Sequence, residues 1–322
     1  MRYFLASLRD CPCDMICAGP GKAKRGWGIV SSGWRFALAL FAVVAPGIAA
    51  AADLPAEPAP APAPTAPAAY MPAVPDWIVT IGAEGRIVPE WPGASDKKLG
   101  GSALPLFSIR KEGTPPDFFG PRDSFGFNVI NLGAFQLGPA LQFINQRKAS
   151  SYAELNGLAD VNYAAQLGLF ANFWPLPWLR LRGEIRQGIG GETGVTGDLF
   201  LDAVVPVGQW TLSAGPRVTF QTAAATSPYF SFTAAQAEIA NTTGQPPLPA
   251  TGYTAGGGLY SYGAGTQLQY TFSPAWTAHA FVEYQRLEGS AADSPLVTQR
   301  GSPNQFTYGL GATYSFAMSP WW

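Results

Sequence analysis

Phe306-Thr-Tyr-Gly-Leu-Gly-Ala-Thr-Tyr-Ser-Phe316, close to the end of the chain, alternates apolar with small or polar residues without a break. Successive side chains of a β-strand point to opposite faces, so this segment has one apolar face and one small, polar face. The apolar face carries four aromatic residues. An aromatic-rich strand near the C-terminus is typical of the closing strand of an outer-membrane β-barrel.

The same two-residue alternation recurs along the chain in segments of about ten residues, the length that a tilted strand needs to cross a bilayer. These segments are 77–86, 135–143, 163–173, 178–186, 210–221, 260–272 and 276–285. Tight turns at 174–177, 206–209 and 273–275 alternate with longer loops at 147–160, 188–195, 222–256 and 288–305. We therefore predict an all-β fold, a transmembrane antiparallel up-and-down β-barrel, over residues 76–316.

The strand number depends on residues 112–133, where the pattern fits either one strand or a hairpin. An even number is needed if both ends of the barrel lie in the periplasm, so we predict 12 strands, with ten as the alternative. Composition agrees with strands. The 322 residues include 37 glycines and 13% aromatics, and no run of about 18 apolar residues follows the N-terminal region.

The N-terminal residues 1–52 have the pattern of a secretory signal peptide with an over-long leader. Basic residues precede an apolar run at 36–45, and small residues at 50–52 offer a cleavage site. The leader is so long that translation starting at Met15 is an alternative. Residues 53–75, rich in proline and alanine, are expected to be an extended periplasmic linker or docking arm. Residues 317–322 would overhang the last strand.

The three cysteines, Cys11, Cys13 and Cys17, all lie in the predicted leader, so the mature chain would have no thiol. Without a second group of ligands they do not predict a metal site. Cleavage after residue 52 would leave 14 Lys and Arg against 19 Asp and Glu, a formal charge of −5. That balance does not favour nucleic acid as a partner.

One segment, 178–186, has charged residues in the phase that faces away from its leucines. A charge facing lipid near the bilayer midplane would cost about 2–4 kcal/mol, so we expect these residues to face the lumen. They would join charges of other strands in a lumen network that either pairs internally or lines a selective pore. Its predicted members are Glu84, Arg86, Arg180, Arg182, Glu184, Arg186, Asp198, Asp202, Arg217, His279 and Glu283.

Enzymatic chemistry is not predicted. The single histidine, His279, has no spacing motif that joins it to a nucleophile, and neither a phosphate loop nor a cluster of metal ligands is present. We therefore expect no catalytic, cofactor-binding or metal-binding residues.

Two stretches carry a family resemblance. Residues 284–305, with the aromatic strand that follows, resemble the C-terminal signature of the MipA/OmpV outer-membrane proteins, and Pro89-Glu-Trp-Pro-Gly-Ala-Ser-Asp96 resembles the family's N-terminal element. The resemblance implies an outer-membrane β-barrel, with a lytic murein transglycosylase and a murein synthase as partners of one member. The signature loop residues are Arg286, Asp293, Ser294, Pro295, Gly301, Ser302, Asn304 and Gln305. Turns and salt links involving Arg286, Asp293 and Arg300 are expected to order this loop at the outer rim.

Taken together, these features predict a non-enzymatic barrel in the outer membrane of a Gram-negative bacterium, in contact with outer-membrane lipid and with the barrel assembly machinery. Its predicted role is structural or scaffolding, for murein-remodelling enzymes by resemblance. The alternative is a porin-like channel for small solutes with Arg180, Arg182, Arg186 and Arg217 along its lumen.

Overall fold

The computed structural model describes residues 77–101, 106–113 and 118–319, so the predicted signal peptide and linker lie outside the described residues. Strands dominate this part of the chain, as alternation and glycine-rich turns predict. They are β1 (Trp77–Pro89), β2 (Lys97–Gly101), β3 (Leu106–Lys111), β4 (Phe125–Gly126), β5 (Ile130–Asn131), β6 (Phe135–Ile144), β7 (Ala164–Leu176), β8 (Leu179–Gly190), β9 (Val195–Val207), β10 (Trp210–Gln221), β11 (Gly258–Thr271), β12 (Trp276–Leu287) and β13 (Asn304–Met318).

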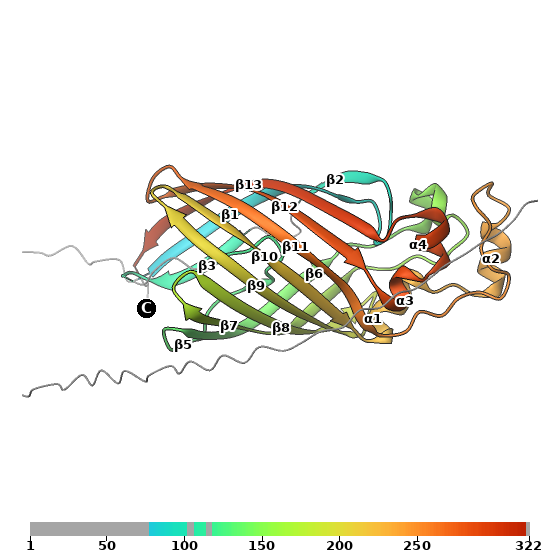
Figure 1. The fold of residues 1–322 in the computed structure, drawn as a ribbon, viewed down its shortest axis with the longest axis horizontal. Helices are drawn as coiled ribbons and strands as arrows, with labels where there is room; N and C mark the ends of the chain where they lie inside the picture. The colour runs from blue at the N-terminus through green and yellow to red at the C-terminus, as the bar shows by residue number, and fades with distance from the viewer. Residues whose placement is uncertain (1–76, 102–105, 114–117, 320–322) are drawn as a thin grey trace, which may run out of the picture. The chain divides into compact units, whose positions relative to one another are not determined.

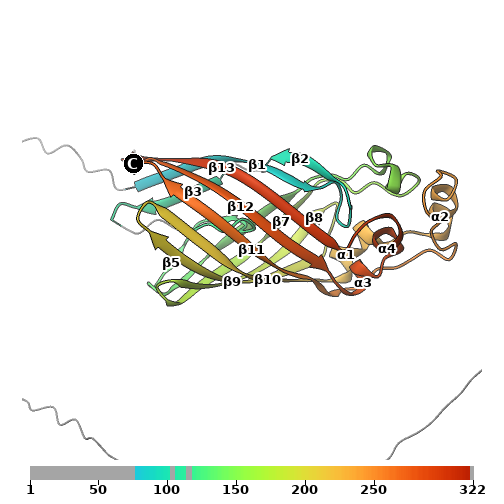
Figure 2. The same cartoon turned by 45° about the horizontal axis from the view of Figure 1, so that its top comes forward.

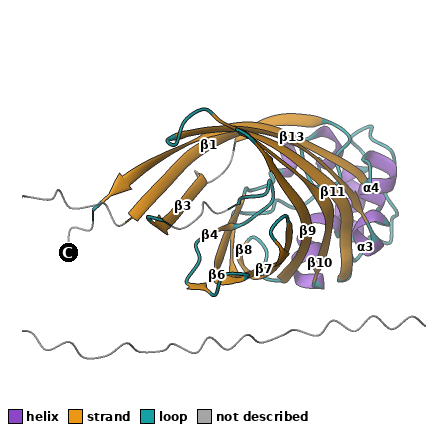
Figure 3. Cartoon of the chain, turned by 60° about the vertical axis from the view of Figure 1, so that its left-hand side comes forward, coloured by secondary structure: helices purple, strands orange, loops and turns teal. Residues whose placement is uncertain are grey.

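The strands form a single antiparallel sheet that curls round on itself (Figure 3). From β6 to β13 each strand pairs with the next along the chain, which is the predicted up-and-down order. The last strand then pairs with the first, from Trp77 opposite Met318 to Ile87 opposite Tyr308. The aromatic strand therefore closes against β1 as predicted, and it continues two residues beyond Phe316.

Two wall positions are each filled by a pair of short strands. β2 and β3 pair with different halves of β1, and β4 and β5 pair with different parts of β6. The thirteen strands thus occupy eleven positions in the described residues. The segment where the strand count was open, 112–133, includes β4, β5 and residues 118–124, and the last of these do not lie in the wall but contact side chains of the lumen.

The outer face of the wall is apolar, because alternate side chains face the lipid. On β8, exposed and buried side chains alternate: the exposed fraction is 42% for Leu181 and 60% for Ile185, whereas the charged residues in the other phase, Arg180, Arg182 and Glu184, are buried. A soluble protein would not leave such a face uncovered, since large contiguous apolar surfaces mark membrane or partner contacts. The burial pattern therefore agrees with a strand wall that spans a bilayer.

The two ends of the sheet differ. Short connections join β7 to β8, β9 to β10 and β11 to β12 at the end where β1 begins and β13 finishes, which is the periplasmic end of such barrels. The opposite end bears a helical cap (Figures 1 and 2), formed by η1 (Ala149–Ser151), η2 (Ala153–Leu155), α1 (Ala223–Phe230), α2 (Ala234–Ala240), α3 (Gly289–Ala292) and α4 (Pro295–Arg300). Among the described residues, every helix is too short or too polar to cross a membrane.

Candidate functional site: the charged lumen and the outer cap

The lumen-facing charges of β8 and β9 are brought together by the register of the two strands. Arg180 lies directly opposite Asp202, whereas Glu184 lies opposite a second carboxylate, Asp198, and the two share Arg186. An Arg180 Nη2 to Asp202 Oδ2 distance of 2.6 Å closes the first ion pair, and Arg186 Nη2 lies 2.5 Å from Asp198 Oδ2. All five side chains are at most 5% exposed. The wall thus carries its charges as buried pairs.

The neighbouring strands extend this network in both directions. Arg217 on β10 lies 2.5 Å from the second oxygen of Asp202, so this carboxylate bridges two guanidinium groups. On β8 itself, Glu184 accepts from Arg182 at 2.6 Å and also contacts Arg186. The carboxylates thus alternate with arginines along the wall, which offsets the cost of burying each charge.

Residues 118–124 are the part of the lumen that the sequence did not predict, and we call them the plug segment. Asp123 accepts from Arg180 Nη1 at 2.6 Å and Nη2 at 3.0 Å, a two-pronged contact with a guanidinium group. Arg122 reaches the other side, with Nη2 3.3 Å from Asp198 Oδ1 and Nε 3.4 Å from Glu283 Oε1. One cation and one anion of the plug segment therefore each complete a cluster of opposite charge on the wall.

The backbone of the plug segment is held as well. Arg86 donates to the carbonyl oxygen of Pro121 at 3.1 Å, and Gln267 donates to that of Phe119 at 3.1 Å. The backbone amide of Ser124 donates to Glu184 at 3.2 Å. Backbone groups inside a lumen need such partners, because an unsatisfied buried carbonyl or amide costs free energy. With Arg122 and Asp123, the plug segment contacts β1, β8, β9, β11 and β12.

A second cluster joins β1 to β12 across the intervening strand β13. His279 Nε2 is 2.8 Å from Glu84 Oε2, and the same carboxylate contacts Arg86. The imidazole lies over Gly311, where a Cβ atom would come within 2.6 Å of its Cε1 atom. The single histidine is therefore a packed lumen residue that is hydrogen-bonded to a carboxylate.

Every predicted member of the lumen network is thus found in one of these connected clusters. The prediction did not include Arg122 and Asp123, which the sequence presents as a turn signal, Gly120-Pro-Arg-Asp123. The signal that could have revealed them is an adjacent cation and anion within an otherwise uncharged stretch. Aromatic rings add to the packing: Arg182 lies 4.0 Å from the Phe170 ring centroid and Arg180 lies 4.6 Å from that of Phe118.

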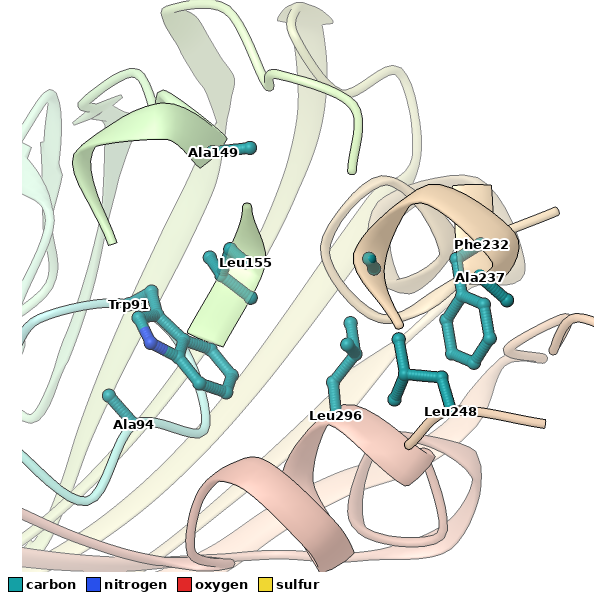
Figure 4. Packing of buried hydrophobic residues seen from close by; sticks show 9 residues of the cluster. Trp91, Ala94, Ala149, Leu155, Phe232, Ala237, Leu248 and Leu296 are labelled. Atoms are coloured by element: carbon teal, nitrogen blue, oxygen red, sulfur yellow. The ribbon is translucent and has the colours of Figure 1, made fainter. Parts of the chain in front are cut away.

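The second predicted group, the signature loop, forms much of the outer cap. Trp91, from the N-terminal element, is 2% exposed and packs in one apolar cluster with Leu155 and Leu296 (Figure 4). The amide of Gly93 donates to Gln305 Oε1 at 3.2 Å, and Gln305 Nε2 donates to the Ala94 carbonyl at 3.2 Å. The two stretches that carry the family resemblance, about 200 residues apart in sequence, therefore lie against each other.

One expectation for the signature loop is wrong. Arg300 was expected to form a salt link at the rim, but it is 7% exposed and donates to carbonyl oxygens: Pro246 at 2.7 Å, Glu154 at 2.8 Å and Ala240 at 3.3 Å. Burial lowers the pKa of this guanidinium. The loop is ordered mainly by buried apolar residues of α4 and by these carbonyl contacts. The ion pair of the loop is Arg286 with Glu288, at 3.3 Å on the surface.

The remaining signature residues also have defined places. Ser294 donates to the Phe230 carbonyl at 2.8 Å, which joins α4 to α1. Pro295 is the first residue of α4, where its missing amide hydrogen costs nothing. The amide of Ser302 donates to the Gly93 carbonyl at 2.8 Å, and a Cβ at Gly301 would lie 2.0 Å from that same oxygen. The last two are exposed: Asp293 follows α3, and Asn304 accepts from Tyr284 and Arg286.

Two further buried groups of the cap were not predicted. Arg147 donates to the Tyr229 carbonyl at 2.6 Å, and burial lowers the pKa of its guanidinium to about 10. Glu192, in the connection between β8 and β9, accepts from Gln166, and burial raises the pKa of its carboxyl. Across the described ranges, His, Cys, Asp and Glu side chains form no group of three that could hold a metal ion.

These features define the class of protein: an antiparallel outer-membrane β-barrel whose lumen contains a charged plug segment and whose outer end is capped. The chain belongs to the MipA family, described as "MltA-interacting protein MipA", because residues 81–316 match the family model. It is accordingly a protein of the Gram-negative outer membrane. Among curated proteins, none matches the chain significantly.

Solved structures give loose matches to outer-membrane proteins. An outer-membrane channel of the COG4313 group from Pseudomonas putida F1 shares 10% identity, with a TM-score of 0.34, over 79% of this chain and 100% of that chain. A loop-deletion mutant of OmpT, an outer-membrane protein of Vibrio cholerae, shares 8% identity, with a TM-score of 0.33, over 75% and 98%. LpxR from Salmonella typhimurium shares 10% identity, with a TM-score of 0.32, over 74% and 100%. The fold assignment therefore rests on the sheet itself.

Proposed function

We propose that this chain is a non-enzymatic, non-conducting barrel with a structural role in the cell envelope. The observation that supports this is the plug segment, whose Arg122 and Asp123 pair with Asp198, Glu283 and Arg180 of the wall. A selective pore needs charges that remain available to a passing solute. Here the arginines predicted to line such a pore are each paired with carboxylates at short distance, so the arrangement favours a filled lumen over the channel alternative.

The partner of such a structural barrel is proposed from the family alone. The family description names MltA, and a murein-remodelling enzyme in the periplasm is therefore the partner class. The docking element we propose is the proline- and alanine-rich tract at 53–75, because the turns that join β7 to β8, β9 to β10 and β11 to β12 at the periplasmic end of the wall, 174–178, 206–210 and 271–276, carry no charged residue. Uncharged turns of this length offer little polar surface for a soluble enzyme.

Planar-bilayer conductance tests the lumen. We expect the refolded mature chain to give no discrete channels, and the double variant Arg122→Ala/Asp123→Ala to give them, because the plug segment then loses its two charged anchors. A matched control, Lys148→Ala/Asp293→Ala, also removes one cation and one anion but from the exposed outer rim, and it should remain silent. Discrete channels from the unmodified chain would overturn the non-conducting assignment in favour of the porin-like one.

A pulldown tests the scaffold. The refolded chain, with and without residues 53–75, is mixed with purified lytic transglycosylase and murein synthase. Retention that depends on the tract supports the proposal. If neither enzyme is retained by either form, the scaffold role is refuted, whatever the conductance result.

A further inference from the structure

The outward face near the outer end of β2 combines an unusually exposed leucine with a lysine. Leu99 is 82% exposed and lies opposite Ile87 of β1, itself 44% exposed on the lipid side. Lys97 lies two residues further toward the cap on the same face, opposite Pro89, and is exposed. An apolar side chain with a cation just above it matches the boundary between acyl chains and head groups.

A second cation flanks the same face on β12. Arg286 is in the outward phase with Tyr284, above the aromatic pair that Tyr284 forms with Phe306, whose ring centroids are 5.0 Å apart. Phe306 in turn stacks on Tyr308, at 6.3 Å. Tyr308 lies opposite Ile87, so these aromatic rings lead across β13 and β1 to Leu99. The result is an apolar strip with a basic residue at each side of its outer end.

We propose that this strip binds the phosphorylated glycolipid of the outer leaflet, with acyl chains along Ile87, Leu99 and Tyr308 and with head-group phosphates at Lys97 and Arg286. The order β2, β1, β13, β12 separates Lys97 and Arg286 by three strand intervals, or about 14 Å across the sheet, and the register sets Arg286 two residues further toward the cap. Such a spacing suits a head group with two separate phosphates better than a lipid with one. A guanidinium can take a phosphate with two parallel hydrogen bonds, and an ammonium binds it as a point charge.

The local charges are compatible with this ligand. Arg286 contacts Glu288 at 3.3 Å, but both side chains are more than a third exposed, at 42% and 34%. Exposed ion pairs of this kind contribute little, so a phosphate can take the place of the carboxylate. Lys98, next to Lys97, is turned to the cap instead, where its Nζ lies 2.6 Å from the Tyr152 hydroxyl. The two adjacent lysines thus supply a test variant and a matched control.

The experiment measures binding of lipid A by the full-length mature chain in phosphatidylcholine nanodiscs, by native mass spectrometry or by titration. Each of Lys97→Gln and Arg286→Gln should weaken binding by about fivefold, and the double variant by about 25-fold, since each basic residue near an anionic lipid surface contributes a factor of this size. Lys98→Gln should bind like the unmodified chain. Lipid A lacking one phosphate should bind less tightly to the unmodified chain than the form with two.

Each outcome decides the proposal. It is overturned if the double variant binds lipid A as well as the unmodified chain, or if Lys98→Gln loses as much as Lys97→Gln, because the effect would then follow net charge alone. Equal affinity for phosphatidylglycerol would likewise assign the surface to anionic lipid in general and not to this glycolipid. The heat-dependent mobility shift of each variant on gels shows that its barrel is folded before binding is compared.

Discussion

Asp123→Asn removes one negative charge from the plug segment and keeps the shape of the side chain. In the unmodified chain this carboxylate accepts two hydrogen bonds from Arg180, at 2.6 and 3.0 Å, and lies 3.6 Å from Arg182. Arg180 would keep only Asp202, a carboxylate that it shares with Arg217. The substitution therefore leaves one buried positive charge uncompensated.

Breaking a buried ion pair by removing one partner costs about 3–5 kcal/mol, because the remaining charge stays away from water. We therefore expect the free energy of unfolding of Asp123→Asn to fall by about 3 kcal/mol or more, a change of roughly 100-fold in the unfolding equilibrium. The assay is urea unfolding of the refolded mature chain in lipid vesicles, followed by tryptophan fluorescence. Asp293→Asn, an exposed aspartate in the outer cap, should change the midpoint little.

A double-mutant cycle separates the pair from other effects. Arg180→Met alone should also be strongly destabilising, because it leaves Asp123 and Asp202 without a shared cation. With both substitutions the loss should be smaller than the sum of the two single losses, since the second change removes the charge that the first left unpaired. Additive losses, or a loss below about 1 kcal/mol for Asp123→Asn, would show that the plug segment is not held by this contact.

Three further predictions concern the cap. Gly301→Ala should destabilise the protein by about 1–3 kcal/mol, because its Cβ would lie 2.0 Å from the Gly93 oxygen; Gly256→Ala, with its nearest atom at 3.9 Å, is the control, and equal urea midpoints would contradict the contact. Burial raises the pKa of the Glu192 carboxyl in the folded protein, so its tighter proton binding stabilises the folded state fully below about pH 4, and this contribution is lost as pH rises through the folded pKa. As pH rises from about 4, the urea midpoint of Glu192→Gln should therefore increase relative to that of the unmodified chain. A difference between the two midpoints that does not change with pH would refute this. Arg300→Lys keeps the charge but loses the fork that reaches three carbonyls, so limited proteolysis should cut the loop between β10 and β11 faster while the heat-dependent gel shift of the barrel stays unchanged.

The strands of the wall were predictable because the direction of each side chain follows from the alternation within a single strand. A lipid-facing position tolerates no charge, so alternation within β8 alone fixes which way Arg180 and Glu184 point. Closure of β13 against β1 was also predictable, since a barrel must pair its first and last strands. Lumen residues could therefore be named from their phase, although the pairs between them depend on register, which a single sequence does not give.

The plug segment and the cap were not predictable in the same way. Gly120-Pro-Arg-Asp123 has the composition of a surface turn, and only the buried wall charges around it give Arg122 and Asp123 a reason to be inside. The carbonyl contacts of Arg300 likewise depend on segments 54 to 146 residues away in sequence. Contacts that join distant segments carry no periodic signal, so the rim salt links expected from local spacing were wrong for this residue.

The charge network also explains why a structural barrel would keep so many buried ions. Buried ion pairs add little to stability compared with apolar packing, but an arrangement of the strands that breaks them is strongly destabilised. A slip of β8 by one residue would turn Arg180, Arg182 and Arg186 toward lipid, at about 2–4 kcal/mol for each near the midplane. The same slip would take Arg180 away from Asp202 and from the plug segment. The network therefore selects one register for the wall and one position for the plug segment. A rigid, filled barrel requires such a fixed arrangement, whereas a pathway for solutes does not.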